Sequence, residues 1–383
     1  MNAFRPQPSH RVQGLLIRTQ SQVDAPKVGE QVLAQLQAQD LAPHVLVTRE
    51  SDAQGHFVRL RLNDSAMALW APEFDTLSLC NRLSLDAAHH DSDLQREIVL
   101  TLLMGPVAFE FPSLQELVSA VRIRHNIVHA ARKTTLAFHT SEAERPADCW
   151  QYGEETGFIL LPGVHLVPAL LKTTQPDVSG TLYSFSCYRA TEYVTLLGIA
   201  QELATVNPSL HQQLQHLWEH RAVASGEFHD VFLREQGSMD APLPPHYFVP
   251  GDRTWFRNPD EASADAEGFE GSWVMYLGGG LFNNFWKREQ PFTMTTKCVE
   301  LYHWRHAMYT DDHGHARIDE TKVAALVQAS LKDPQAVERI MAVMARYREP
   351  RGVYTAAGGC IDTTREFARW VHPGTSDLVL PER

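Results

Sequence analysis

The sequence predicts an α+β fold, because strand-like and helix-like hydrophobic patterns occupy different stretches of the chain. Short apolar or alternating segments, typical of strands, occur at residues 12–18, 44–48, 57–62, 254–256 and 273–277. Longer stretches with apolar residues three and four positions apart, typical of helices, occur at residues 27–38, 114–132, 187–206, 209–221, 321–331 and 334–347. With 383 residues, 44% of them hydrophobic, the chain is long enough for two or three structural units with real cores.

The N-terminal elements form a small unit of their own. A strand at 12–18 precedes a helix at 27–38, and the segments 44–48 and 57–62 alternate as a hairpin would. We expect residues 1–98 to be an accessory α+β module. It would pack on the following domain or present a sheet edge to a partner.

The middle of the chain, residues 99–310, is expected to be the main domain. Its predicted helix at 187–206 follows a short aromatic run, which places Cys187 at the head of that helix. Residues 311–383 are expected to form a C-terminal helical extension. Its helices lie at 321–331 and 334–347, and a further helical pattern follows Cys360.

Composition excludes several classes of function. The formal charge of −12 argues against a nucleic-acid-binding surface. No apolar run is long enough to cross a bilayer, and the first residues lack the basic and apolar regions of a signal peptide. We therefore expect a cytoplasmic protein with no membrane partner, with leaderless export left open. The sequence does not define an oligomeric state.

The cysteines and histidines do not suggest a metal site. The five cysteines are widely separated and form no CxxC spacing, so we expect free thiols in a reducing compartment. The histidine pairs at 89/90 and 313/315 are interpreted as ordinary polar positions, the second lying in a turn. We expect no bound metal and no cofactor.

Cys187 is the residue most suited to carry chemistry. A helix N-terminus offers unpaired N–H groups and a partial positive charge, which can lower a thiol pKa and stabilise an oxyanion. The alternative is a buried cysteine of the core, since free cysteine is among the most buried residue types.

Four blocks, in order, resemble the small bacterial transglutaminases of spore coats, whose catalytic domain has an NlpC/P60-like (papain-like) fold. The sequence GTLYSFSC, which ends at Cys187, resembles the nucleophile block of that family, and PGDRTWFRNPD (residues 250–260) resembles its PGDCxYFKNPD motif. Residues 105–131 resemble the entry strand and first long helix, and residues 270–282 resemble the following hairpin. The resemblance implies a catalytic cysteine at Cys187 and a protein or peptide substrate.

Three positions depart from the family pattern. Ser186 stands where the family has a glutamate before the cysteine, and Ser272 stands where it has a second glutamate. Along an ungapped hairpin, Phe285 occupies the position of the catalytic histidine. A thiol needs a base or a cationic neighbour to become a nucleophile at neutral pH, so ordinary transglutaminase activity should be weak or absent.

Three functional hypotheses follow. In the first, Cys187 attacks a glutamine-type amide and forms a thioester, as a divergent acyltransferase or amidohydrolase. In the second, the protein is a catalytically inactive binding or scaffold protein of the same fold. In the third, Cys360, which follows two glycines, pairs with His303 or His306 in a papain-like peptidase or amidase. Here residues 299–306 would form a strand, and the two histidines, three apart, would project to opposite faces.

Overall fold

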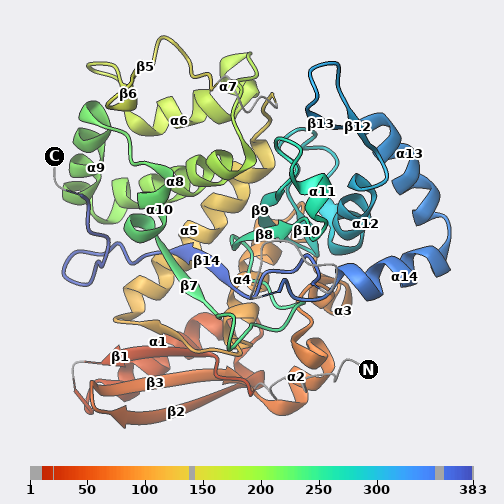
Figure 1. Cartoon of the computed structure of the whole chain (residues 1–383). Coiled ribbons are helices and arrows are strands. Elements are labelled where there is room, and N and C mark those ends of the chain that lie inside the picture. Colours follow the sequence, from red (N-terminus) through yellow and green to blue (C-terminus); the bar gives the residue numbers. More distant parts are fainter. Residues whose placement is uncertain (1–10, 20, 138–142, 350–357, 382–383) are drawn as a thin grey trace.

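A computed structural model describes residues 11–19, 21–137, 143–349 and 358–381. The chain is mixed α and β, as predicted, and is built around two sheets (Figure 1). Within the described residues, every helix is too short or too polar to cross a membrane.

The N-terminal sheet has the strand order β2-β3-β1-β4. Its strands are β1 (Leu15–Thr19), β2 (Val45–Asp52), β3 (Gly55–Leu62) and β4 (Phe109–Phe111). The helix α1 (Ala25–Gln37) packs on this sheet and buries Val32 and Leu36. The predicted strands and helix are therefore confirmed. β4 follows the expected module boundary at residue 98, yet it pairs in parallel with β1, so the module and the next region share one sheet.

Further helical elements lie between the strands of this sheet. The short η1 (Ala42–His44) precedes β2, and between β3 and β4 follow α2 (Asp64–Trp70), η2 (Pro72–Phe74), α3 (Leu79–Leu83) and α4 (Asp91–Leu103). The last of these packs against the long helix α5 (Leu114–Lys133).

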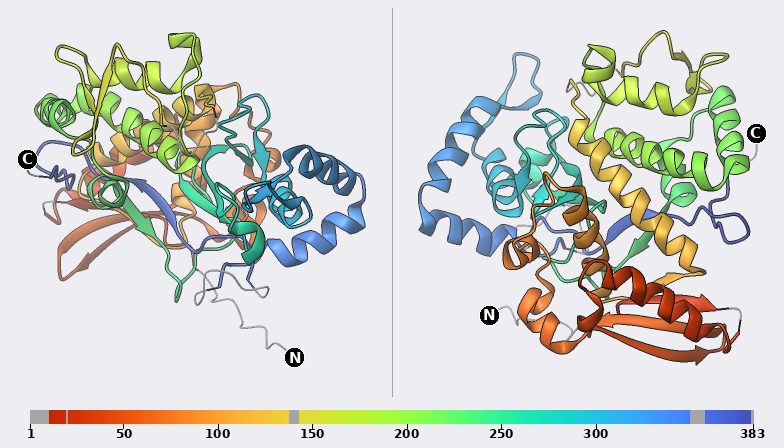
Figure 2. Two further views of the ribbon diagram at one scale, coloured as in Figure 1. Left: turned by 45° about the horizontal axis from the view of Figure 1, so that its top comes forward. Right: turned by 180° about the vertical axis from the view of Figure 1, so that it is seen from behind.

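Two long helices cross in the centre of the fold (Figure 2). α5 begins after Ser113, whose hydroxyl accepts a hydrogen bond from the N–H of Glu116, and α8 (Cys187–Val206) begins after Ser186 in the same way. The helices are close at Gly198, where a Cβ atom would lie 2.6 Å from the Cγ1 atom of Ile127. α8 packs against α5, α6 (Leu166–Thr174), α9 (Pro208–His220) and α10 (Ser225–Phe232). In turn, α7 (Pro176–Ser179) packs on α6, and the hairpin of β5 (Trp150–Gly153) and β6 (Gly157–Leu160) packs on α9.

The second sheet has the strand order β11-β10-β9-β8-β14-β7. Its strands are β7 (Leu233–Gln236), β8 (Arg253–Arg257), β9 (Gly271–Gly278), β10 (Leu281–Phe282), β11 (Phe292–Thr293) and β14 (Arg365–Ala368). β14 comes from the C-terminal region that was expected to be helical, so the predicted helix after Cys360 is wrong. The extended backbone pairs with β7 on one side and β8 on the other, while the ring of Phe367 packs 5.5 Å from that of Phe109.

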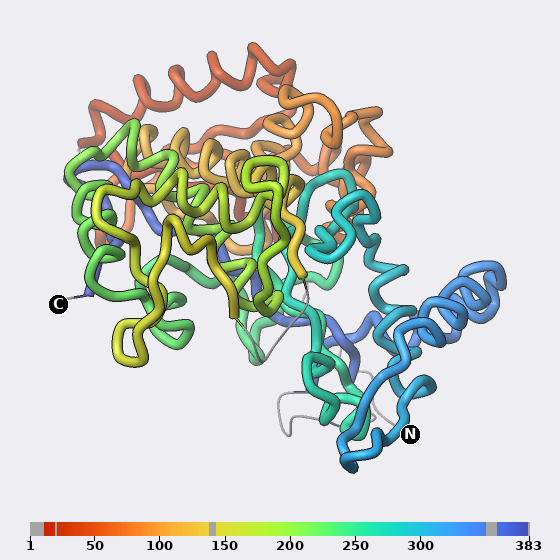
Figure 3. Tube along the Cα trace, turned by 90° about the horizontal axis from the view of Figure 1, so that it is seen from above, coloured from red at the N-terminus to blue at the C-terminus, as the bar shows by residue number. Residues whose placement is uncertain are grey.

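The remaining helices surround a second hydrophobic core. They are α11 (Glu261–Ala264), α12 (Met294–Trp304), α13 (Glu320–Leu331) and α14 (Pro334–Met344), with a hairpin of β12 (Met308–Thr310) and β13 (Ala316–Ile318). Both predicted C-terminal helices are confirmed, and they project to one side of the molecule (Figure 3). The strand predicted at 299–306 is wrong. A capping box between Thr293 and Thr296 starts a helix there, and Cys298, Leu301 and Trp304 form its buried stripe.

Candidate active site

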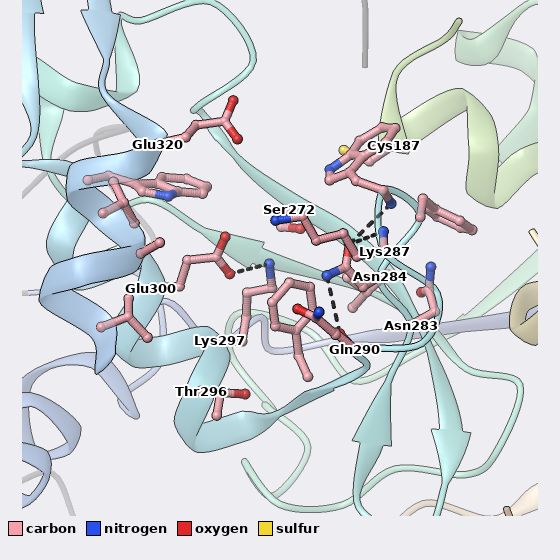
Figure 4. Close-up of a pocket in the computed structure, with 18 of the residues that line it drawn as sticks. Cys187, Ser272, Asn283, Asn284, Lys287, Gln290, Thr296, Lys297, Glu300 and Glu320 are labelled. Carbon is pink, nitrogen blue, oxygen red and sulfur yellow. Dashed lines mark hydrogen bonds and ion pairs between the residues drawn. The ribbon is translucent and has the colours of Figure 1, made fainter. Parts of the chain in front are cut away.

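A pocket of about 370 Å³ lies in front of Cys187. Its walls come from the first residue of α8, the start of β9, the loop at residues 283–287, and helices α12 and α13. Figure 4 shows Lys297, Glu300 and Glu320 on the helical side of the pocket, across from Cys187, with Ser272 between them. The fold thus places the predicted nucleophile at the wall of an open cavity.

The solvent exposure of Cys187 as a whole is intermediate, but protein atoms closely surround its sulfur. Burial raises the pKa of the thiol above its ordinary value. The backbone N–H groups of Trp273 and Tyr188 and the charge of Lys297 oppose this effect without overcoming it. A lowered thiol pKa at this helix N-terminus is therefore not found, because desolvation of the thiolate has the larger effect.

No histidine is among the described residues that line this pocket. Ser272 and Phe285, which stand at the family's glutamate and histidine positions, both line it. The ring of Phe285 is 3% exposed and belongs to the main hydrophobic core. A phenyl ring accepts no proton, so this wall supplies shape and apolar surface.

The charged groups of the pocket were not anticipated from the sequence. The Lys297 side chain is 3% exposed, and its Nζ atom lies 2.9 Å from a carboxylate oxygen of Glu300 and 3.6 Å from the centre of the Phe292 ring. A lysine and a glutamate three residues apart are a recognisable ion-pair pattern in a helical sequence. Only the structure shows that this pair is buried in a pocket wall and does not lie on the surface. Lys297 is thus a fixed positive charge on the wall opposite the thiol.

The loop that carries Phe285 is held by an asparagine. The side-chain oxygen of Asn284 accepts hydrogen bonds from the backbone N–H groups of Trp286 (3.1 Å) and Lys287 (3.2 Å). Its amide donates to the backbone carbonyl of Gln290 at 3.2 Å (Figure 4). This local network fixes the side of the pocket next to Cys187.

The other predicted site residues are not joined to one another as a Cys–His pair in the described part of the chain. The sulfur of Cys360 is fully buried, 3.4 Å from that of Cys298 and 3.1 Å from the backbone oxygen of Met344. Burial raises its pKa well above the ordinary value. His303 contacts Ser330 through Nε2 at 2.7 Å and His306 through Nδ1 at 3.2 Å. The two histidines thus lie together near the end of α12, rather than on opposite faces of a strand.

Comparison with known proteins agrees with the pattern of blocks around Cys187. The family model described as protein-glutamine gamma-glutamyltransferase matches residues 78–378, which is most of the chain. The chain belongs to this family. A protein-glutamine gamma-glutamyltransferase of Halalkalibacterium halodurans is 24% identical over 213 residues, which cover 54% of this chain and 69% of that protein.

The extent of the family match bears on the C-terminal region. Residues 78–378 include β14, which completes the sheet that carries the pocket wall β9. The match thus covers α13, α14 and β14 as well as residues 99–310, the range that the sequence predicts for the main domain.

Proposed function

We propose that the protein is a divergent transglutaminase-like acyltransferase or amidohydrolase that acts on a glutamine-type amide of a protein or peptide. The observation that carries this proposal is the place of Cys187, at the N-terminus of α8 and on the wall of a pocket large enough for a side-chain carboxamide. Family membership supports the same class of reaction. An NlpC/P60-like core is part of this proposal.

The reaction would proceed through a thioester. The Cys187 thiolate attacks the amide carbon, the S–C bond forms, the C–N bond breaks, and ammonia leaves after taking a proton from solvent. An amine or water then attacks the thioester and regenerates the thiol. The N–H groups of Trp273 and Tyr188, which point toward the sulfur, and the N-terminus of α8 would stabilise negative charge during these steps.

The raised thiol pKa determines how this enzyme would respond to pH. With no imidazole on the described walls, the thiol loses its proton to solvent, and the rate follows the fraction of thiolate. Activity would thus be slow at neutral pH and would rise by about tenfold per pH unit until the thiol pKa is passed.

A second candidate function is binding without turnover. The raised pKa of Cys187 and the phenyl ring of Phe285 in place of an imidazole favour it. The peptidase hypothesis based on Cys360 receives no comparable support, because that sulfur is fully buried.

The deciding experiment measures incorporation of a fluorescent alkylamine into a glutamine-containing protein, together with ammonia release, from about pH 7 to about pH 10. Cys187→Ala should abolish both signals, whereas Cys149→Ala, which removes another thiol, should keep them. Signals that are absent at every pH would favour the binding function. Signals that are unchanged in Cys187→Ala would place the activity at another residue and contradict the proposed role of Cys187.

A gain-of-function variant sharpens this test. Ser272→Glu combined with Phe285→His restores the family's residue types at two of the three departing positions, and should shift the onset of incorporation toward neutral pH. If activity rises in the double variant and Cys187→Ala then removes it, the natural pocket is a weakened form of the family's site.

A further inference from the structure

A cluster of metal-binding side chains lies between α4 and α5, apart from the Cys187 pocket. Asp91 is the first residue of α4, and His125 and His129 stand four residues apart on α5. One ligand atom from each of the three residues lies within 4.8 Å of the others. The Nε2 atoms of His129 and His125 are 2.9 Å and 3.7 Å from the same Oδ1 atom of Asp91.

These distances fit a shared ion. Two ligands at about 2.0–2.1 Å from a tetrahedral zinc ion are about 3.3 Å apart, and the observed 2.9 Å and 3.7 Å lie on either side of that value. The imidazole rings are 4.4 Å apart and tilted by 46°, so both nitrogens can face one point. A small side-chain rotation would therefore admit a metal ion.

The surroundings leave the site accessible. The side chains of His125, His129 and Asp91 are 28%, 34% and 67% exposed, which leaves room for a water ligand. The guanidinium of Arg132, a nearby positive charge, donates hydrogen bonds to the backbone carbonyls of Ala87, Ala88 and Leu277, which fix its position without cancelling its charge. Two imidazoles and one carboxylate with an open position suit zinc and similar divalent ions.

We propose that Asp91, His125 and His129 form a binding site for zinc or a similar first-row divalent cation. The ion would join the start of α4 to the middle of α5, so it would stabilise the packing of these two helices. The site is independent of the proposed reaction at Cys187.

The chain contains a matched control cluster. His216, Glu219 and His220 also bring three ligand atoms within 4.8 Å of one another. All three residues lie on the single helix α9, and the Nδ1 atom of His220 contacts the backbone oxygen of His216 at 2.8 Å. An ion bound there would join no second element of the fold, so we expect it to be bound more weakly than an ion that joins α4 to α5.

The test is a calorimetric titration of the metal-free full chain with zinc chloride. We expect one tight site per chain, an affinity at least about tenfold weaker in His125→Ala, His129→Ala and Asp91→Asn, and an unchanged affinity in His216→Ala/His220→Ala. Zinc should raise the melting temperature of the wild type and leave that of His129→Ala unchanged.

Several results would overturn the proposal. The first is a wild-type zinc affinity in His129→Ala and in Asp91→Asn. The others are loss of zinc binding in His216→Ala/His220→Ala and loss of zinc binding in Cys187→Ala. Melting curves recorded without zinc show whether each variant is folded, and the three separate ligand variants keep the test decisive if one of them is not.

Discussion

Replacing Gly198 with alanine tests how α8 is positioned against α5. A Cβ atom at this position would lie 2.6 Å from Cγ1 of Ile127, 3.1 Å from the Ile127 backbone nitrogen and 3.3 Å from the backbone oxygen of Ile123. Carbon atoms in contact are normally about 3.5–4.0 Å apart, so the helices must separate by about 1 Å. Because two of the three atoms belong to the backbone, a simple side-chain rotation cannot relieve the contact.

The expected magnitude follows from two opposing contributions. Overpacking of this kind costs about 3 kcal/mol at the upper end of its usual range. The better helix propensity of alanine returns about 1 kcal/mol. Gly198→Ala should therefore lower the free energy of unfolding by about 2 kcal/mol.

Urea unfolding followed by tryptophan fluorescence measures this change, and Gly29→Ala is the matched control. Gly29 also lies within a helix, but a Cβ atom there would lie 3.6 Å from its nearest neighbour, Cγ1 of Val47, which is an ordinary contact distance. Gly29→Ala should raise the free energy of unfolding by about 1 kcal/mol. Equal stabilisation by both substitutions would refute the argument that α5 and α8 require a glycine at their crossing.

Two further predictions concern buried charges. A hydrogen bond to Glu366 raises the pKa of His229 in the folded protein. The stabilising contribution of this pair to the free energy of unfolding is therefore fully present below the unfolded pKa of about 6.5, and it is lost as the pH rises through the folded pKa. His229→Gln should therefore cost more unfolding free energy at about pH 6 than at about pH 8.5. Arg124→Met should lower the free energy of unfolding, measured in urea, by about 3–5 kcal/mol. The substitution removes the partner of the buried Asp252 carboxylate, which lies 2.7 Å from the guanidinium. Restored stability in Arg124→Met/Asp252→Ala would support that cause.

The fold was most predictable where a polar cap directly precedes a long apolar stripe. Ser113 and Ser186 mark the starts of α5 and α8, and both predicted helices agree with the structure within a residue or two. Residues 299–306 taken alone predict a strand, because the capping box at Thr293 that marks the start of the helix lies before them. β14 is extended because of its neighbours β7 and β8, which are more than a hundred residues distant in sequence, and no local pattern indicates them.

The position of Cys187 at the head of a helix was predictable from the sequence, and so was the absence of a histidine from the described walls of its pocket. Cys187 heads a helix at the wall of a pocket, as expected, but the sign of its pKa shift depends on burial, which the sequence does not give. The sequence spacing of His125 and His129 is typical of two ligands on one helical face. Their third partner, Asp91, is supplied by a different helix, so only the tertiary structure brings the cluster together.

The position of β14 has a consequence for the order in which the molecule can fold during synthesis. Glu366 pairs with Arg253, 113 residues earlier in the chain, and β14 is the only connection in the sheet between β8 and β7 among the described residues. The ribosome must therefore synthesise and release the residues of β14 before the sheet that carries the pocket can close. Until then β7 and β8 each expose an unpaired backbone edge. The intermediate in which β14 has not yet paired is therefore the stage most prone to aggregation and most in need of chaperones.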